Sequence, residues 1–302
     1  MRRRRLSASP AARLTLLGLL LLGATAVLLA NPRHRAFYFG AGSPPGAERS
    51  GLRLPSTTRF GRAPDAPAIS PIAAVNPSRR VPLPEPDGRI PIPIANRVPS
   101  RLPAEGVPAG WELKEFAGRA AVELVRDEGS VAVRLRSAQA SFALYRDVIA
   151  DLGEYPVLSW RWKVVKLPPA GDVRAAATDD QAAQVYVVFP RWPAPLVNSE
   201  VIGYVWDSRA PVGTQLTSPK APNVRIIVVE SGPARLDTWQ LQARNVAEDY
   251  VALFGRKPPR VGQVALMIDS NDTRADAEAL FSWLAFGKTR AASMEKPTSM
   301  LR

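Results

Sequence analysis

The sequence predicts a mainly β protein: an antiparallel β-sandwich of jelly-roll type with one helix packed on it, preceded by an N-terminal membrane helix and a disordered proline-rich linker. Three observations predict this organisation. An apolar run occupies residues 14–30, and 16 of the chain's 30 prolines lie in residues 31–109. From Trp111 onward, short segments rich in β-branched and aromatic residues alternate with Gly, Pro, Asp and Asn, which is the pattern of strands joined by turns.

The N-terminal apolar run predicts a membrane anchor. Its 17 residues make about 25 Å of helix, just enough to cross a bilayer core. Arginines at positions 2–5 and 13 favour a cytoplasmic N-terminus. We therefore expect residues 1–30 to hold the chain in a bacterial inner membrane as a single-pass protein, with its C-terminal domain in the periplasm. The same pattern is typical of a secretory signal, so cleavage near Ala24-Thr25-Ala26 and secretion form the alternative.

Residues 31–109 are predicted to form a disordered linker. Segments such as VPLPEPDGRIPIP at 81–93 lack the backbone donors that regular structure needs and favour polyproline II. The folded domain is predicted at 110–288, and the polar residues 289–302 are predicted to be a disordered tail.

Nine strands are expected in the folded domain, at 120–124, 130–136, 141–145, 157–164, 184–189, 202–206, 224–230, 261–268 and 280–286. One helix is expected at 238–254, because Val246, Tyr250, Leu253 and Phe254 form an apolar stripe at helical spacing that Gly255 ends. Helices do not alternate with the strands, which disfavours a parallel sheet.

Charge and composition exclude several functions. Residues 1–109 carry 16 Lys and Arg against 5 Asp and Glu, whereas residues 110–288 carry 21 of each. The basic excess lies outside the domain, so we predict no nucleic-acid partner. The chain has no cysteine, and its single histidine is His34. Disulfides, a thiol nucleophile and histidine catalysis are therefore absent from the folded domain.

Aromatic residues are the first candidate ligand contacts. Trp160 and Trp162 share a strand face with Leu158 and Val164, so core packing is favoured over sugar stacking. The same reasoning applies to the face formed by Ile202, Tyr204 and Trp206. Trp192 lies in a proline-rich loop, where exposure to a ligand is expected.

Two acidic groups border predicted strands. Asp179 and Asp180 precede the strand at 184–189, and Asp269, Asn271 and Asp272 follow the strand at 261–268. Capping of turn amides is the favoured interpretation for the second group, and a structural Ca²⁺ is the alternative, although the Gly and distal Glu of an EF-hand loop are missing. A third hypothesis makes Asp180 and Asp269 an acid/base pair for glycosidic cleavage.

Arg244 and Asn245 lie next to the helix stripe. They are expected to anchor the helix to a sheet by hydrogen bonds. If a pocket lies there, Arg244 is instead the natural group for a carboxylate or sulfate on a ligand.

Several segments of the domain occur in a fixed order: LSWRW (158–162), DDQAAQVYVVF (179–189), YVWDSRAPVGT (204–214) with Ser218-Pro219, VVESG (228–232), residues 239–258, and VALMIDSNDT (264–273). In these segments the domain resembles DUF3047, an uncharacterised family of exported bacterial proteins. The chain departs from the family pattern at Gln184, an arginine position, and at Ser270, where Thr is favoured; loss of that arginine removes a partner for the acidic group. The resemblance implies a sandwich similar to sugar-binding jelly rolls, and no established activity.

Three functions follow from these observations. The favoured one is a non-catalytic module that binds a glycan or another envelope component in a groove on one sheet, with Trp192, Asp179, Asp180 and Arg244 as contacts and no cofactor. The second is a carboxylate-dependent glycan hydrolase or lyase. The third is an envelope assembly or scaffold factor with a protein partner.

Overall fold

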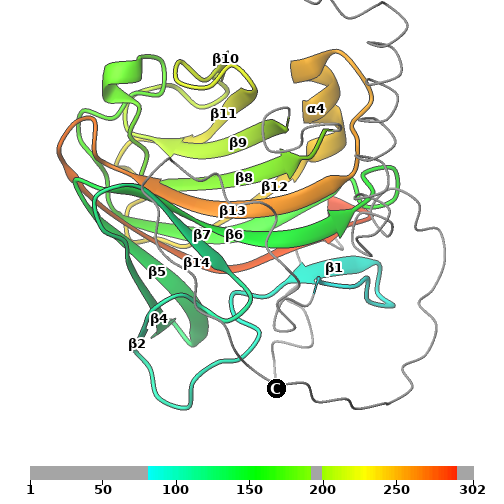
Figure 1. Ribbon diagram of the computed structural model, residues 1–302, viewed down its shortest axis with the longest axis horizontal. Helices are drawn as coiled ribbons and strands as arrows, with labels where there is room; N and C mark the ends of the chain where they lie inside the picture. Colours follow the sequence, from blue (N-terminus) through cyan, green and yellow to red (C-terminus); the bar gives the residue numbers. More distant parts are fainter. Residues whose placement is uncertain (1–80, 192–198, 291–302) are drawn as a thin grey trace, which may run out of the picture. The chain divides into compact units, whose positions relative to one another are not determined.

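The computed structural model describes residues 81–191 and 199–290. In this part of the chain, two seven-stranded sheets and the helix α4 (Val246–Phe254) form a mainly β, two-layer arrangement (Figure 1). Sheet A contains β1 (Arg89–Ile92), β2 (Ala104–Glu105), β4 (Ala121–Asp127), β5 (Ser130–Ala138), β7 (Val157–Lys166), β12 (Gln240–Asn245) and β14 (Asp276–Gly287). Sheet B contains β3 (Glu112–Ala117), β6 (Ser141–Ala150), β8 (Ala183–Phe189), β9 (Glu200–Asp207), β10 (Gln215–Thr217), β11 (Val224–Ser231) and β13 (Val261–Asp269).

The strand order explains how the two layers are connected. Sheet A runs β12-β7-β14-β5-β4-β2, with β1 also beside β14, and sheet B runs β10-β11-β9-β8-β13-β6-β3. The described chain changes sheet eight times: β3, β6 and β13 each lie in sheet B between strands of sheet A, and β8 to β11 form a longer run in sheet B between β7 and β12 of sheet A. Among the described strands, pairing is antiparallel except between β9 and β11. The β10–β11 hairpin places β10 on the outside and returns β11 against β9 in parallel, which the antiparallel prediction did not include.

All nine predicted strands are confirmed, as β4 to β9, β11, β13 and β14. The strands β3 and β10 were not predicted. The strand β3 is largely exposed, and β10 has only three residues, so neither carries the apolar alternation that marks a half-buried strand.

Aromatic residues from both sheets fill the core. Trp160 of β7 stacks on Tyr204 of β9 with ring centroids 5.2 Å apart. Trp162 lies 6.0 Å from Trp206 and 6.3 Å from Phe281. All five side chains are fully buried, because alternate residues of each strand point between the sheets. The prediction that the paired tryptophans pack in the core is confirmed.

The predicted helix at 238–254 is too long at its N-terminal end. Gln240–Asn245 form β12, which pairs antiparallel with β7, and the helix begins at Val246. The side chain of Asn245 caps it by accepting a hydrogen bond from the Glu248 N–H. Gly255 ends it in the left-handed conformation, as predicted. The helical spacing therefore holds only from Val246, and the polar residues before it belong to an edge strand.

The predicted boundary of the linker at residue 109 is wrong. Ile90, Ile92 and Ile94 are buried in the core, and β1 pairs with the end of β14. Pro91 lacks a backbone donor, but β1 has a partner on one side only in the described sheet, where a proline is tolerated. The buried guanidinium of Arg146 fixes the segment after β1 by donating to the Pro93 carbonyl oxygen and to Asn96 Oδ1.

The predicted anchor at residues 1–30, the first part of the linker and, except for its first two residues, the predicted tail at 289–302 lie outside the described residues. Within the described ranges, no helix has the length and apolar character needed to cross a membrane.

Candidate functional site

The outward-facing side of sheet B carries a row of two tyrosines separated by a small residue. Tyr145 of β6 and Tyr186 of β8 are both opposite Ala265 of the central strand β13. Gly203 of β9 continues the row beside Tyr186. Both tyrosines are partly exposed, and Ala265 is buried beneath them. Two strand spacings place the Cα atoms of the two tyrosines about 9.6 Å apart.

Gly203 is required by the position of the Tyr186 ring. A Cβ atom at this position would lie 2.5 Å from Cε1 of Tyr186. The ring therefore lies against the backbone of β9, in space that a side chain at residue 203 would otherwise fill. This contact holds the ring across the sheet surface, the orientation that presents an aromatic face to a ligand.

A polar group adjoins Tyr186 on the same sheet face. The Tyr186 hydroxyl donates a 2.6 Å hydrogen bond to Oε1 of Gln184. Gln184 is buried, and its Nε2 donates to the Gln181 carbonyl oxygen at 3.4 Å. Burial raises the pKa of the Tyr186 hydroxyl. Tyr186 therefore remains a neutral ring with a fixed hydroxyl.

Two buried carboxyl groups lie at the end of this face. Asp269 ends β13 opposite Ser141 of β6, and Asp179 accepts a hydrogen bond from Gln181 Nε2 at 3.2 Å. Burial raises the pKa of Asp179 to about 6. Burial, together with the charge of Asp180, raises the pKa of Asp269 to about 8. Near pH 7 the arrangement favours one protonated and one ionised carboxyl group.

Lys220 approaches the two carboxyl groups from the β10–β11 turn. It forms an ion pair with Asp272, which follows β13. Its charge also lowers the pKa of Asp179 and Asp269, although burial outweighs this effect at both. The hydrogen bond to Asp272 contributes to a raised pKa of Lys220 itself. The ion pair therefore connects the two turns beside the carboxyl groups.

Asp180 has a structural role, which contradicts its predicted pairing with Asp269 as an acid/base dyad. The Asp180 carboxylate accepts hydrogen bonds from the Asp272 N–H at 3.1 Å, the Thr273 N–H at 2.6 Å and the Thr273 hydroxyl at 2.5 Å. It is completely buried. Its oxygens are thus engaged in holding the turn after β13.

The calcium hypothesis for Asp269, Asn271 and Asp272 has little support from these contacts. Asn271 Nδ2 donates to Asp272 Oδ1 at 3.2 Å, and Asp272 also pairs with Lys220. Within the described ranges, no group of three or more acidic or histidine side chains could hold a metal ion. The residues fit a hydrogen-bonded turn better than a calcium site.

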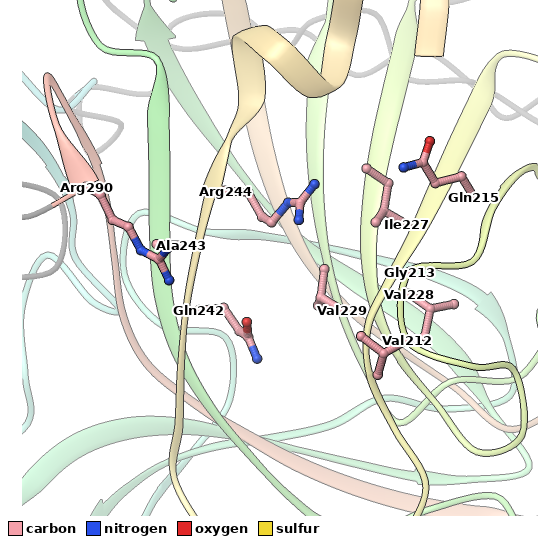
Figure 2. Close-up of a pocket in the computed structure, with 10 residues that line it drawn as sticks. All are labelled: Val212, Gly213, Gln215, Ile227, Val228, Val229, Gln242, Ala243, Arg244 and Arg290. Carbon is pink, nitrogen blue, oxygen red and sulfur yellow. The ribbon is translucent and has the colours of Figure 1, made fainter. Parts of the chain in front are cut away.

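Arg244 lies at a different place, on β12 at the edge of sheet A. Its Nε donates to Asp249 Oδ2 at 3.0 Å and its Nη2 to Asp249 Oδ1, and the Tyr204 hydroxyl donates to the same carboxylate at 2.8 Å. This supports the predicted role of Arg244 in fixing the helix to the sheets. Arg244 also lines a small pocket (Figure 2).

The four predicted ligand contacts therefore do not form one site. Asp179 borders the tyrosine row, Asp180 supports a turn, Arg244 lies at the β12 edge, and Trp192 lies outside the described residues. Sequence reasoning missed the two tyrosines, although each alternates with inward-facing apolar residues along its strand, as an outward-facing residue must.

Comparison with known proteins identifies the family. The model of the family described as Protein of unknown function (DUF3047) matches residues 109–284, and the chain belongs to this family. The predicted resemblance is confirmed. The family match begins after β1 and β2, so the ordered structure extends beyond it. A search of curated proteins gave no match.

Solved structures with a likeness to this chain include three proteins that act on or bind carbohydrates. The xyloglucanase domain of NopAA from Sinorhizobium fredii is 10% identical over 63% of this chain and 100% of that chain, with a TM-score of 0.36. The family 11 carbohydrate-binding module of Lic26A-Cel5E from Clostridium thermocellum is 8% identical over 62% and 96%, with a TM-score of 0.33. The Spr0440 glycoside hydrolase domain, Endo-D, from Streptococcus pneumoniae R6 is 8% identical over 60% of this chain, at a TM-score of 0.31, and this chain spans only 22% of its length.

Proposed function

We propose that the outer face of sheet B binds a glycan chain, with Tyr145 and Tyr186 as stacking platforms. The observation that carries this proposal is the row Tyr145–Ala265–Tyr186–Gly203 across four neighbouring strands. Aromatic rings stack on the apolar faces of sugar rings. Tyr145 and Tyr186 lie on the same face of the sheet with one strand between them, so a single chain that lies over the sheet can contact both.

The polar groups beside the rings indicate the kind of glycan. Gln184 and the carboxyl groups of Asp179 and Asp269 supply hydrogen-bond donors and acceptors along one side. With pKa values of about 6 and about 8, the two carboxyl groups are largely uncharged in mildly acidic conditions. A neutral polysaccharide therefore suits this face better than a highly charged one.

Affinity electrophoresis of the purified chain in soluble polysaccharides tests the proposal. We expect retardation in at least one neutral polysaccharide, and Tyr145→Ala should weaken it about tenfold, because an aromatic contact contributes about 0.5–1.5 kcal/mol beyond its buried area. Leu241→Ala is the control, since Leu241 is an exposed apolar residue on β12, in the other sheet. No retardation in any polysaccharide, or equal losses in the two variants, would contradict glycan binding on this face.

Within this proposal the glycan belongs to the bacterial envelope. The basic N-terminus and the apolar run at 14–30 support an inner-membrane anchor with the sandwich in the periplasm, or secretion after cleavage. Protease added to spheroplasts should digest the sandwich if it is periplasmic, and carbonate extraction separates an anchored chain from a secreted one. Protection of the sandwich in intact spheroplasts would exclude this location.

A second candidate function, glycan hydrolysis, is favoured by the raised pKa values of the two carboxyl groups. At pH 7, Asp269 would be the general acid and the ionised Asp179 the base or nucleophile. Release of reducing ends from a retained polysaccharide, lost in both Asp179→Asn and Asp269→Asn but kept in Asp276→Asn, would support it. Retention without any release would leave binding alone.

A further inference from the structure

The pocket that Arg244 lines is between β12 of sheet A and β11 of sheet B, away from the tyrosine row. It has a volume of about 260 Å³ (Figure 2). This space could hold about eight or nine waters at 30 Å³ each, roughly a single sugar ring. Its lining residues are Val212, Gly213, Gln215, Ile227, Val228, Val229, Gln242, Ala243, Arg244 and Arg290.

Polar side chains occupy inward-facing positions of β12, where a sandwich normally places apolar residues. Gln242 and Arg244 are opposite Trp160 and Leu158 of β7, whose side chains are fully buried in the core. Figure 2 shows Arg244 projecting from β12 toward Ile227 across the pocket. These residues therefore border a space that continues the core outward to solvent.

The charge of Arg244 is balanced within the protein. Its Nε and Nη2 pair with Asp249, which leaves Nη1 outside this ion pair. The guanidinium also lies 6.0 Å from the centroid of Tyr204. A bidentate pair fixes the planar guanidinium. Arg244 therefore offers a positioned N–H donor, and the ion pair as a whole has no net charge. This balance weighs against the carboxylate or sulfate ligand predicted for Arg244.

The remaining lining combines amide and apolar groups with a second guanidinium, that of Arg290. The side chains of Gln242 and Gln215 make no hydrogen bond with any residue in 81–191 or 199–290. Val212, Val229 and Ile227 supply apolar walls. An amide side chain both donates and accepts, so the pocket matches a ligand that has a neutral amide next to a methyl group.

We propose that this pocket binds the acetamido group of an N-acetylated sugar. The ligand's amide oxygen would accept from Arg244 Nη1 or from a glutamine amide, its N–H would donate to a glutamine oxygen, and its methyl group would contact the valines. The two glutamine amides, the valine wall and the single-ring volume carry this choice, and pairing with Asp249 balances the charge of Arg244. The pocket does not depend on glycan binding at the tyrosine row.

Saturation-transfer NMR and calorimetric titration with three probes test the proposal on the full chain. N-acetyl-D-glucosamine should bind at least tenfold more tightly than D-glucose, and D-glucuronate no more tightly than D-glucose. A smaller preference for the acetamido sugar, tighter binding of glucuronate, or no binding of any probe would overturn the proposal.

Variants on one strand provide the matched control. Gln242→Leu should weaken N-acetyl-D-glucosamine binding about fivefold, the expected effect of losing one neutral hydrogen bond. Gln240→Leu should leave it unchanged, because Gln240 is two residues away on the same strand face and does not line the pocket. Tyr145→Ala should also leave it unchanged, which separates this pocket from the proposed glycan face. Equal affinities for Gln242→Leu and the unmodified chain would contradict the assignment.

Discussion

Replacement of Asp269 by asparagine tests the cause of the raised pKa in the candidate site. In the folded chain the pKa of Asp269 is about 8, compared with 3.8 for an ordinary aspartate. Because each pKa unit corresponds to about 1.4 kcal/mol, ionising this carboxyl group costs up to about 6 kcal/mol more in the folded chain than in the unfolded chain. Asparagine resembles the protonated carboxyl group and does not ionise, so the variant lacks this energetic cost.

The sign of the effect follows from proton binding. Between pH 4 and pH 8 the folded chain holds a proton on Asp269 that the unfolded chain releases, so the stability contributed by this group falls as the pH rises. The stability of Asp269→Asn relative to the unmodified chain should therefore increase steadily over this range. We expect an increase of several kcal/mol, with about 6 kcal/mol as the upper limit.

Urea denaturation at a series of pH values measures this difference. Trp160, Trp162 and Trp206 are fully buried, so their fluorescence reports unfolding of the core. Asp276→Asn is the control for loss of an aspartate, because Asp276 has a half-exposed side chain paired with Lys166 at 2.8 Å. If the advantage of Asp269→Asn does not grow between pH 4 and pH 8, burial does not hold this carboxyl group in its protonated form.

Three further changes have defined outcomes. Asp180→Ala removes three hydrogen bonds to the turn after β13 and should lower the free energy of unfolding by about 2–4 kcal/mol in urea denaturation. Gly203→Ala should displace the Tyr186 ring, because the added Cβ would lie 2.5 Å from it; we expect a loss of about 1–3 kcal/mol and weaker retention in polysaccharide gels. Gln184→Arg should lower the pKa of Asp269 by adding a nearby cation, and NMR titration of the carboxyl carbon would show no decrease if residue 184 lies too far away.

The main strands and their core could be predicted from sequence because strong alternation marks them. Trp160 and Trp162 share a face with Leu158 and Val164, and the structure places both tryptophans between the sheets. Strands with a weaker sequence pattern were not predicted, for physical reasons. The strand β1 contains a proline and is recognisable only through its pairing with β14, a contact between segments almost 200 residues apart.

The helix boundary shows how local spacing can mislead. Gln240–Asn245 precede a true helical stripe and contain nothing that forbids a helix, yet they form an edge strand on β7. Pairing with β7 satisfies backbone groups and places Gln242 and Arg244 beside the pocket. Tertiary contacts therefore decided the conformation of this segment, against its local preference.

The candidate site was only partly predictable, because distance along the chain does not reveal which groups share a surface. Asp179 and Asp180 are neighbours in sequence, but Asp179 borders the outer face, whereas Asp180 accepts hydrogen bonds from the turn after β13. The tyrosines come from β6 and β8, and β13, much later in the chain, lies between them. Only the strand order of sheet B brings these residues together.

The residue at position 184 gives the raised pKa values a physical context. Gln184 is opposite Met267, two residues before Asp269 on the neighbouring strand, and its amide is buried. A glutamine supplies hydrogen bonds but no positive charge. Lys220 is therefore the cation that lowers the pKa values of the two buried carboxyl groups. Burial raises these pKa values by more than Lys220 lowers them. An arginine at residue 184 would favour their ionised forms, so this single position shifts the face between a charged and a nearly neutral surface.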